Sequence, residues 1–384
     1  MKQTSRAGKE NQESSLTLLK YSWNDWTIVA EAWQRLHEQA RASIFLKREW
    51  VETWIETFGT QLKPEILIFR DKEVIVGACI ISTLVSWRWY VPVQRAYLNC
   101  TGEPECDDTC LEYNRILCLP GYDESVSKVL VEYLRRKRWD EFVLNGMEVR
   151  KENKSLFKLA PHIVSVERSS WYVDLDHLRS NKTDYASSLS SNTRRQIHRS
   201  IRLYEELYGK ITVQQFDREG DMISRLDELS SLHQRSWVAR NQPGVFSSEK
   251  FVRFHRSVIQ RLSRDGSVHV LRVIAGRQTV GMLYNFFCHG RIYFYQSGFS
   301  YENDARMKPG LMTHFMAIDH YLRNCPEMLE YDFLAGDSQY KRSLSKSQRP
   351  LHWIVVRRPN LRSTLVEVMR RVKRTMIFNT RKVA

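Results

Sequence analysis

The sequence lacks a long apolar run and a paired set of cysteines. No stretch approaches the roughly eighteen consecutive apolar residues that a membrane-spanning helix needs, and residues 1–15 are polar, without the apolar centre of a secretory signal. The seven cysteines are odd in number and belong to a chain of 384 residues, so we expect free thiols instead of a disulfide framework. These absences predict a folded cytoplasmic protein.

The motifs of several enzyme classes are also missing. Neither G-x-S-x-G nor G-x-x-x-x-G-K-[ST] occurs, which argues against an α/β-hydrolase and a P-loop nucleotidase. The eleven histidines contain no H-x-x-x-H pair. Four cysteines that cluster lack the paired two-residue gaps of a zinc ribbon; these are Cys100, Cys106, Cys110 and Cys118. We therefore predict no metal site.

Apolar and aromatic residues are abundant. Hydrophobic residues make up 42% of the chain, which includes 11 Trp, 17 Tyr and 16 Phe. The length exceeds that of one ordinary hydrophobic core, so two domains or two fused lobes are expected.

Positive charge is concentrated at the C-terminus. The net charge is +15, and the segment from Lys341 to Ala384 holds thirteen Lys or Arg and one acid. Residues 361–378 alternate apolar and basic positions at helical spacing, which predicts a basic C-terminal helix. Such a helix either contacts an anionic membrane, RNA or a polyanionic substrate, or carries a solvated basic face.

A second basic segment follows a Ser-Ser-Asn helix cap in the middle of the chain. Arg195, Arg199 and Arg202 fall on one helix face, and the planar fork of arginine suits phosphate or carboxylate. Pairing with Glu205 and Glu206 on a surface helix is the alternative interpretation.

The two halves of the chain repeat one order of elements. The first half predicts a helical segment, a hairpin, further strands, a helix and a last strand, over residues 26–58, 65–82, 86–97 with 113–117, 124–137 and 141–145. The second half predicts a three-stranded meander, a helix and a strand, over residues 268–274, 280–287, 292–299, 309–323 and 330–334.

The spacing of Pro and Gly supports a duplication. Pro120 and Gly146 are 26 residues apart, and Pro309 and Gly336 are 27 residues apart. We predict an α/β fold of two tandem lobes, each a mixed sheet flanked by helices. The lobes span residues 16–165 and 166–360, and the basic helix or tail spans residues 361–384.

The start of the second-lobe helix is a candidate anion site. Pro309 fits the first helical turn, and Gly310 lets a ligand approach backbone amides that have no partner inside the helix. Such a helix end suits a phosphate.

Several segments resemble the GNAT acyltransferase superfamily. More narrowly, they resemble the double-lobed branch of FemAB-like transferases and acetyltransferases of cellulose and exopolysaccharide biosynthesis. The resemblance rests on residues 192–197, Trp237, and residues 295–299, 308–312 and 331–341. The common phosphate loop of the superfamily, Gln/Arg-x-x-Gly-x-Gly/Ala, is not met, because Pro309 and Leu311 follow Arg306 at the glycine positions.

The resemblance implies an acyl-coenzyme A donor lying in a V between strands 292–299 and 330–334. Acetyl-CoA or another acyl-CoA would place its pyrophosphate at the helix start, and backbone amides would stabilise the oxyanion. The implied donor-binding residues are Gln296, Ser297, Gly298, Lys308, Gly310, Leu311, Met312 and Thr313.

The resemblance also implies catalytic roles after the last strand. Tyr340 would protonate the leaving thiolate, and Lys341 would lower the phenol pKa or bind the donor. Asp337 would orient the amine or relay its proton, with Asp332 as the second choice. Packing of Tyr340 and helix capping by Asp337 are the structural alternatives, whereas Asp332 inside an apolar strand requires a partner.

The acceptor is expected to contact Arg194, Arg195, Trp237 and Tyr295. We therefore predict an N-acyltransferase that moves an acetyl or longer acyl group to an amine on a small molecule, glycan or peptide, in polysaccharide or cell-envelope biosynthesis. An aminoacyl-tRNA donor and a non-catalytic protein that binds an anionic polymer are the alternatives. Residues 147–149 of the first lobe replace the Tyr-Lys pair, so that lobe is expected to form part of the acceptor cleft without a cofactor.

Overall fold

The computed structural model describes residues 16–100, 111–149 and 151–369, with side chains throughout except at 151–154. In this part of the chain thirteen strands form one mixed sheet in the order β1-β2-β3-β4-β6-β13-β7-β12-β11-β10-β9-β8, with β5 on β3. The strands of the first half are β1 (Thr17–Ser22), β2 (Glu65–Asp71), β3 (Val74–Arg88), β4 (Val91–Leu98), β5 (Leu117–Cys118) and β6 (Glu141–Met147). Those of the second half are β7 (His162–Asp174), β8 (Ile211–Phe216), β9 (Val268–Ala275), β10 (Gln278–Cys288), β11 (Arg291–Phe299), β12 (Glu330–Ala335) and β13 (Ser347–Arg357).

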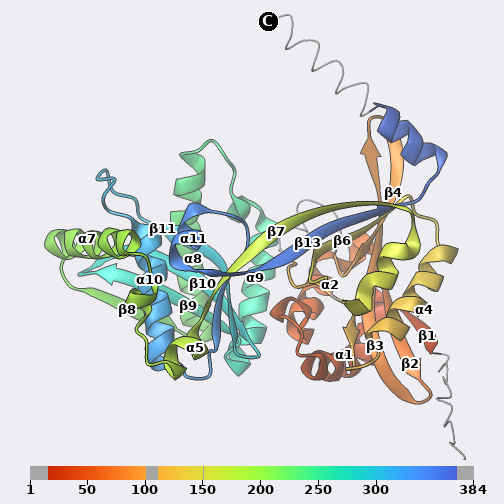
Figure 1. Ribbon diagram of the computed structural model, residues 1–384, viewed down its shortest axis with the longest axis horizontal. Coiled ribbons are helices and arrows are strands. Elements are labelled where there is room, and N and C mark those ends of the chain that lie inside the picture. The colour runs from red at the N-terminus through yellow and green to blue at the C-terminus, as the bar shows by residue number, and fades with distance from the viewer. Residues whose placement is uncertain (1–15, 101–110, 150, 370–384) are drawn as a thin grey trace, which may run out of the picture.

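Helices cover both faces of this sheet (Figure 1). The first half contributes α1 (Trp26–Ala40), α2 (Arg48–Leu62) and α4 (Asp123–Arg136). The second half contributes α5 (Leu175–Ser180), α6 (Tyr185–Ser188), α7 (Ser191–Tyr208), α8 (Glu219–Val238), α9 (Glu249–Leu262), α10 (Pro309–Asn324) and α11 (Gln339–Leu344). Short 3-10 helices span Trp23–Asp25, Ile44–Leu46, Lys151–Leu159, Val245–Ser247 and Ser263–Asp265. A last helix begins at Leu361 and is described to Met369. No helix in the described ranges is both long and apolar enough to cross a membrane.

The repeated order of elements produces the same arrangement in both lobes. In the first lobe β4 and β6 pair in parallel for three residues, from Arg95 opposite Glu141 onward. In the second lobe β11 and β12 pair in parallel for three residues, from Arg291 opposite Glu330 onward. The predicted fold class, two α/β lobes with mixed sheets, is thereby confirmed.

Two long strands that the sequence did not reveal join the lobes. β7 and β13 pair antiparallel over eleven residues, from Ser347 opposite Tyr172 to Arg357 opposite His162. β7 also pairs with β12, and β13 also pairs with β6, so the end of the second half enters the sheet of the first lobe. Figure 1 shows both strands running between the lobes. The predicted boundary at 165/166 falls inside β7.

A shared aromatic core packs the lobes together on one face of the sheet. The ring of Trp50 on α2 lies 5.2 Å from that of Phe254 on α9 and 5.2 Å from that of Phe286 on β10. Phe45 lies 5.6 Å from Tyr293 on β11. α10 and α5 cover the other face, where Ile292 and other alternate residues of β11 and β12 point.

Candidate active site

The strands β11 and β12 part after their short parallel ladder. Pairing ends at Tyr293 opposite Asp332, although β11 continues to Phe299. A bulge lies just beyond this point, because Tyr284 of β10 pairs with Gln296 and Asn285 pairs with Phe294. The extra residue in β11 increases its local twist, as bulges beside active sites do. We call the diverging residues, 294–299 and 333–335, the fork.

The start of α10 lies beside the fork. Its N-cap, Lys308, makes no side-chain capping hydrogen bond, so the first-turn amides have no acceptor from the cap. The Lys308 amide donates to the Ser200 hydroxyl at 2.9 Å and its ammonium donates to the Gln196 side chain at 2.8 Å. A Cβ at Gly310 would lie 3.4 Å from the Phe299 ring. The anion site at this helix start stays a prediction, and α7 lies next to it.

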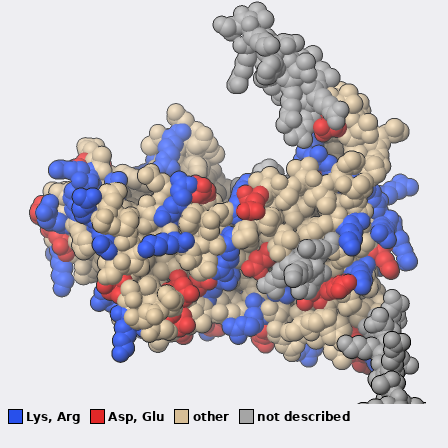
Figure 2. Space-filling view, in the orientation of Figure 1, with Lys and Arg blue, Asp and Glu red and all other residues tan. Residues whose placement is uncertain are grey.

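Cations on α7 extend this positive region. Arg195, Arg199 and Arg202 are exposed and line a shallow depression on the helix. Figure 2 shows Lys and Arg side chains gathered at the α7 end of the molecule. Arg194 faces elsewhere, since its guanidinium donates to the Ser187 and Leu189 carbonyls, both at 3.2 Å. Its predicted contact with the acceptor therefore competes with a structural role in the turn before α7.

The other residues predicted at the helix start are buried. Leu311, Met312 and Thr313 point into the core, so only their backbone can face a ligand. α10 sits tightly on β10 here, because a Cβ at Gly281 would lie 2.3 Å from the Thr313 hydroxyl oxygen.

The fork residues of β11 divide between partly exposed and core positions. Gln296 and Ser297 are partly exposed, whereas Gly298 lies against α8, where a Cβ would be 2.6 Å from the Leu229 carbonyl oxygen. Tyr295 is buried, and its hydroxyl bonds His255 Nε2 at 3.0 Å. Tyr295 thus packs into the core instead of contacting an acceptor as predicted.

Tyr340 lies on the α10 face of the fork. Its ring stacks on His314 with 5.2 Å between centroids, and burial raises the pKa of the phenol. The expected lowering of this pKa by Lys341 is not found. His314, which the sequence analysis did not single out, bonds the Tyr331 hydroxyl through Nδ1 at 3.1 Å. Its Nε2 is buried without a hydrogen-bond partner in the described residues.

The last residues of β12 form an irregularity in its pairing with β7, and charged side chains hold their backbone. Leu334 has φ of 59°, a conformation that a residue of its size rarely adopts. Its amide donates to Asp332 at 2.7 Å. The Lys341 ammonium donates to the carbonyls of Leu334 and Ala335, each at 2.9 Å. The amide of Ala335 donates to the Glu112 carboxylate at 2.6 Å. Lys341 therefore holds the end of β12, whereas the sequence predicted that it would lower the Tyr340 pKa or bind the acyl donor directly.

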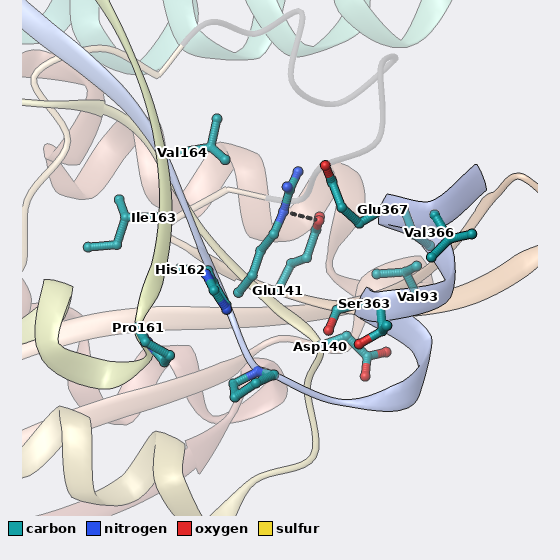
Figure 3. Close-up of a pocket in the computed structure, with 14 residues that line it drawn as sticks. Val93, Asp140, Glu141, Pro161, His162, Ile163, Val164, Ser363, Val366 and Glu367 are labelled. Atoms are coloured by element: carbon teal, nitrogen blue, oxygen red, sulfur yellow. Dashed lines mark hydrogen bonds and ion pairs between the residues drawn. The ribbon is translucent and has the colours of Figure 1, made fainter. Parts of the chain in front are cut away.

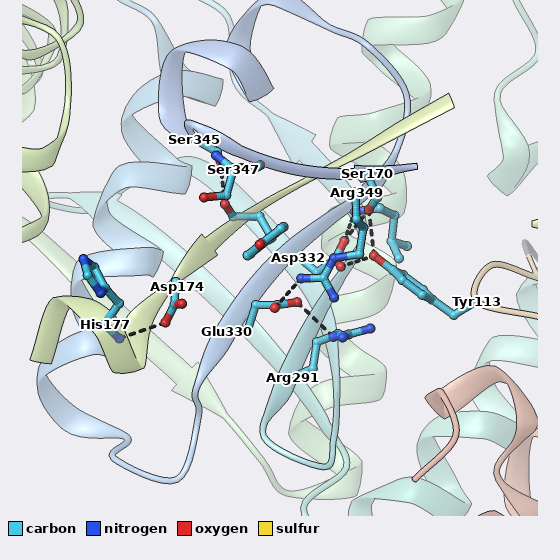
Figure 4. A network of polar contacts seen from close by, with 12 residues as sticks. Tyr113, Ser170, Asp174, His177, Arg291, Glu330, Asp332, Ser345, Ser347 and Arg349 are labelled. Atoms are coloured by element: carbon cyan, nitrogen blue, oxygen red, sulfur yellow. Dashed lines mark hydrogen bonds and ion pairs between the residues drawn. The ribbon is translucent and has the colours of Figure 1, made fainter. Parts of the chain in front are cut away.

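Asp332 has the partners that its position in an apolar strand required. Its carboxylate accepts hydrogen bonds from Ser170 at 2.7 Å and from the hydroxyl of Tyr113, a residue with φ of 53°. Arg291 and Arg349 both pair with Glu330 next to it (Figure 4). Tyr113 also lies under both guanidinium groups. A residue of the first lobe thus completes the buried polar network of the second.

The remaining predicted site residues lie nearer the surface. Asp337 pairs with Arg342 at 2.6 Å and is exposed, five residues from the buried Asp332. Trp237 is partly exposed and stacks on His233 with 5.6 Å between centroids. The roles of both residues stay predictions.

No pattern in the sequence indicated that residues of the first lobe would contact β12 of the second. Glu112 and Tyr113 lie about 220 residues from their partners in β12. The positive φ of Tyr113 is visible only in the fold.

The corresponding fork of the first lobe contains a chain segment. Asn114 donates its amide to the Gly146 carbonyl at 2.9 Å and its side chain to the Leu98 carbonyl at 2.9 Å. A Cβ at Gly146 would lie 2.5 Å from the Leu111 carbonyl oxygen. Residues 111–114 therefore occupy the position between β4 and β6. That the first lobe holds no donor stays a prediction.

A pocket of about 710 Å³ lies beside α11 in the second lobe. Its lining includes Asp174, His177, Asn192 and Arg342, from β7, α5, α7 and α11. Apolar side chains such as Val173, Leu178 and Leu189 line it as well, so the pocket has a mixed polar and apolar wall.

Within the described residues, one group of two histidines and a cysteine outside the fork brings possible metal ligands close together. Ligand atoms of His37, Cys288 and His289 lie within 4.8 Å of one another. Burial lowers the pKa of His37 to about 4, and the nearby Lys47 acts in the same direction. Cys106 and Cys110 of the cluster considered in the sequence lie outside the described residues.

The comparisons with known proteins agree with this architecture. Residues 191–342, from α7 into α11, match the acetyltransferase (GNAT) domain family. This segment contains the fork, the start of α10 and Tyr340. Residues 191–342 therefore form a GNAT domain within a chain of two lobes.

Solved structures of low sequence identity are similar to this chain, and FemX shares its fold. FemX is similar over 88% of this chain and 98% of its own, at 10% identity and a TM-score of 0.55. A tandem GNAT protein from the clavulanic acid biosynthesis pathway covers the same shares at 10% identity and a TM-score of 0.47. The C-terminal domain of a putative lysylphosphatidylglycerol synthetase from Agrobacterium fabrum matches 76% of this chain and 83% of its own, at 12% identity and a TM-score of 0.43. No curated protein matches the sequence.

Proposed function

We propose that the protein is an N-acyltransferase that transfers an acetyl or longer acyl group from acyl-CoA to an amine. One observation carries the proposal: β11 and β12 part beside the start of α10, whose N-cap makes no side-chain capping bond. Unpaired first-turn amides and the helix dipole favour a diphosphate. The cations of Lys308 and α7 add positive charge next to it.

In this reaction the amine nitrogen attacks the thioester carbon, and the carbon–sulfur bond breaks. Backbone amides of the fork near Gln296 and Ser297 would stabilise the oxyanion. Tyr340 would give its proton to the leaving thiolate. Burial raises the pKa of this phenol, which keeps it protonated but makes it a weaker acid. Asp337 would receive the proton of the amine. Asp332 and Lys341 would position the strand end and not the reacting atoms.

Titration with acetyl-CoA tests the donor site. We expect micromolar binding that weakens about tenfold in Lys308→Ala, because a charge-assisted contact is lost. Gly310→Leu would place a bulky side chain beside the Phe299 ring, where the ligand would approach the helix start, and weaken binding further. Lys128→Ala serves as the control, because this lysine is exposed on α4 and pairs with Glu124. Equal affinity in all four proteins would contradict the proposed site.

The role of Tyr340 has a separate test. Tyr340→Phe keeps the ring that stacks on His314 but removes the proton donor. We expect kcat to fall about tenfold to a thousandfold with unchanged acetyl-CoA affinity. An unchanged kcat would indicate that positioning dominates the reaction.

An aminoacyl-tRNA donor is the second candidate. The FemX-like arrangement of lobes and the exposed arginines of α7 favour it. Binding of charged tRNA with steep salt dependence, and no binding of acetyl-CoA, would support this donor. If neither donor binds, the chain is a non-catalytic protein for an anionic polymer.

The acceptor proposal rests on resemblance and on one pocket. We place an amine of a glycan or peptide of polysaccharide or cell-envelope biosynthesis in the pocket of about 710 Å³ beside α11. The donor implies action in the cytoplasm.

A further inference from the structure

Aromatic side chains protrude from the hairpin of β3 and β4, far from the fork. Trp87 is 72% exposed and Tyr90 is 94% exposed, and Trp89 and Val85 are also exposed. Isolated exposed apolar residues need no explanation, but four within six residues at one tip form a patch. Figure 1 shows this tip at the end of the first lobe, on the opposite side from α1.

The tip adopts a turn that its residues disfavour. Trp89 has φ of 51° and Tyr90 has φ of 64°, the positive values of a two-residue type I′ turn. Asn and Gly are preferred at these positions, and bulky aromatic residues are rare there. Strained residues of this kind persist at functional sites, because local stability alone would favour Asn-Gly.

The C-terminal helix presents a second apolar surface near the tip. Four of its residues recur at helical spacing and are exposed, with Leu361 at 90%; they are Leu361, Leu365, Val368 and Met369. The sequence continues through residues 370–384 with six further Lys or Arg and no acid. An apolar helix face next to concentrated positive charge is typical of a helix lying on an anionic lipid surface.

The hairpin and the helix lie on one side of the first lobe. A pocket of about 610 Å³ is lined by Val93 of β4, by Ile163 and Val164 of β7, and by Val366 of the C-terminal helix (Figure 3). Val93 pairs with Ser86, three residues before the turn. Ile163 and Val164 are themselves exposed. The pocket wall is mixed, because Asp140, Glu141 and Glu367 also line it, so the tip and the helix are two apolar surfaces on one side of the lobe.

We propose that these two surfaces dock on an anionic lipid bilayer. Trp and Tyr at the hairpin tip would enter the interfacial layer, where their amphipathic rings are favoured. The apolar helix face would lie in the same layer, and the basic residues after Met369 would meet the lipid phosphates. The docking surface comprises residues 85–90 and 361–369, and its action does not depend on acyl transfer.

Co-sedimentation of the full-length protein with phosphatidylcholine vesicles, with and without phosphatidylglycerol, tests this proposal. We expect binding to vesicles that contain phosphatidylglycerol, weakening as salt is raised. Trp87→Ser combined with Trp89→Ser should weaken binding at least about tenfold, because two interfacial rings are lost. Ile28→Ser is the matched control, since Ile28 is 68% exposed on α1 and lies away from the surface.

A second variant separates docking from folding. Trp89→Asn combined with Tyr90→Gly installs the residues that the turn prefers, so the hairpin should become more stable while vesicle binding weakens. Retention of wild-type vesicle affinity by both variants would overturn the proposal. A wild-type protein that binds neither kind of vesicle would also overturn it. A dimer that becomes a monomer in the Trp variants, without vesicle binding, would assign the surface to a second copy of the chain and likewise overturn it.

Discussion

At the scale of single residues, Tyr113 connects the first lobe to the buried Asp332 carboxylate of β12. Tyr113→Phe keeps the ring but removes one of the donors to a buried charge. We expect the free energy of unfolding to fall by about 1–3 kcal/mol, and acyl transfer to slow because the strand end is held less firmly. Urea denaturation and initial rates would measure both.

The matched control is Tyr122→Phe, whose hydroxyl bonds the Asp71 carboxylate at 3.0 Å near the surface. Water replaces that bond, so stability and rate should stay close to wild type. A Tyr113 variant that behaves like this control would contradict a role for the buried network.

Buried histidines predict a pH dependence of stability. Burial lowers the pKa of His255 and of His314 to about 3, below the ordinary value of 6.5. Below pH 6.5 the unfolded chain therefore binds protons that the folded chain excludes, and stability is lost as the pH falls towards 3. Each such histidine should cost about 2 kcal/mol between pH 7 and pH 5. In His255→Gln this part of the pH slope should vanish from urea unfolding curves. If His255→Gln kept the full pH dependence of the wild-type protein, burial of a neutral His255 would not be a source of that dependence.

At the scale of elements, the segment before α4 determines how the two lobes differ. Asn114 is fully buried and bonds the Leu98 carbonyl and the Asn99 side chain, each at 2.9 Å. Asn114→Ala leaves both partners unsatisfied, so we expect a loss of about 2–4 kcal/mol in the free energy of unfolding. Acetyl-CoA affinity should stay unchanged, because residues 111–114 still occupy the first fork. Additional donor binding in a calorimetric titration of this variant would show that the side chain alone closes that fork.

Local patterns predicted the meanders, α4 and α10, because alternation and helical spacing are properties of neighbouring residues. β7 and β13 were missed for physical reasons. β7 is exposed along most of its length, so its sequence carries no clear apolar alternation, and β13 contains Pro350. Their pairing joins residues more than 170 positions apart. The start of α10 was likewise readable from Pro309 and Gly310, whereas contacts of Glu112 and Tyr113 with β12 depend on the tertiary fold.

At the scale of the whole molecule, the two lobes share a sheet and a core. β13 lies between β6 and β7, so the first lobe is complete only when the end of the second half has folded. Trp50 of the first lobe packs among Phe254 and Phe286 of the second. Two-lobed chains often unfold in separate steps, but here neither lobe keeps its sheet without the other. We therefore predict one cooperative unfolding transition.

Core substitutions in each lobe test this coupling. Phe142→Ala in the first lobe and Ile318→Ala in the second each remove a fully buried side chain. Each should lower the free energy of unfolding by about 2–5 kcal/mol. Because the lobes unfold together, both variants should move the same single midpoint, seen equally by tryptophan fluorescence and circular dichroism. Two transitions, each moved by only one variant, would show that β7 and β13 connect lobes that are independently stable.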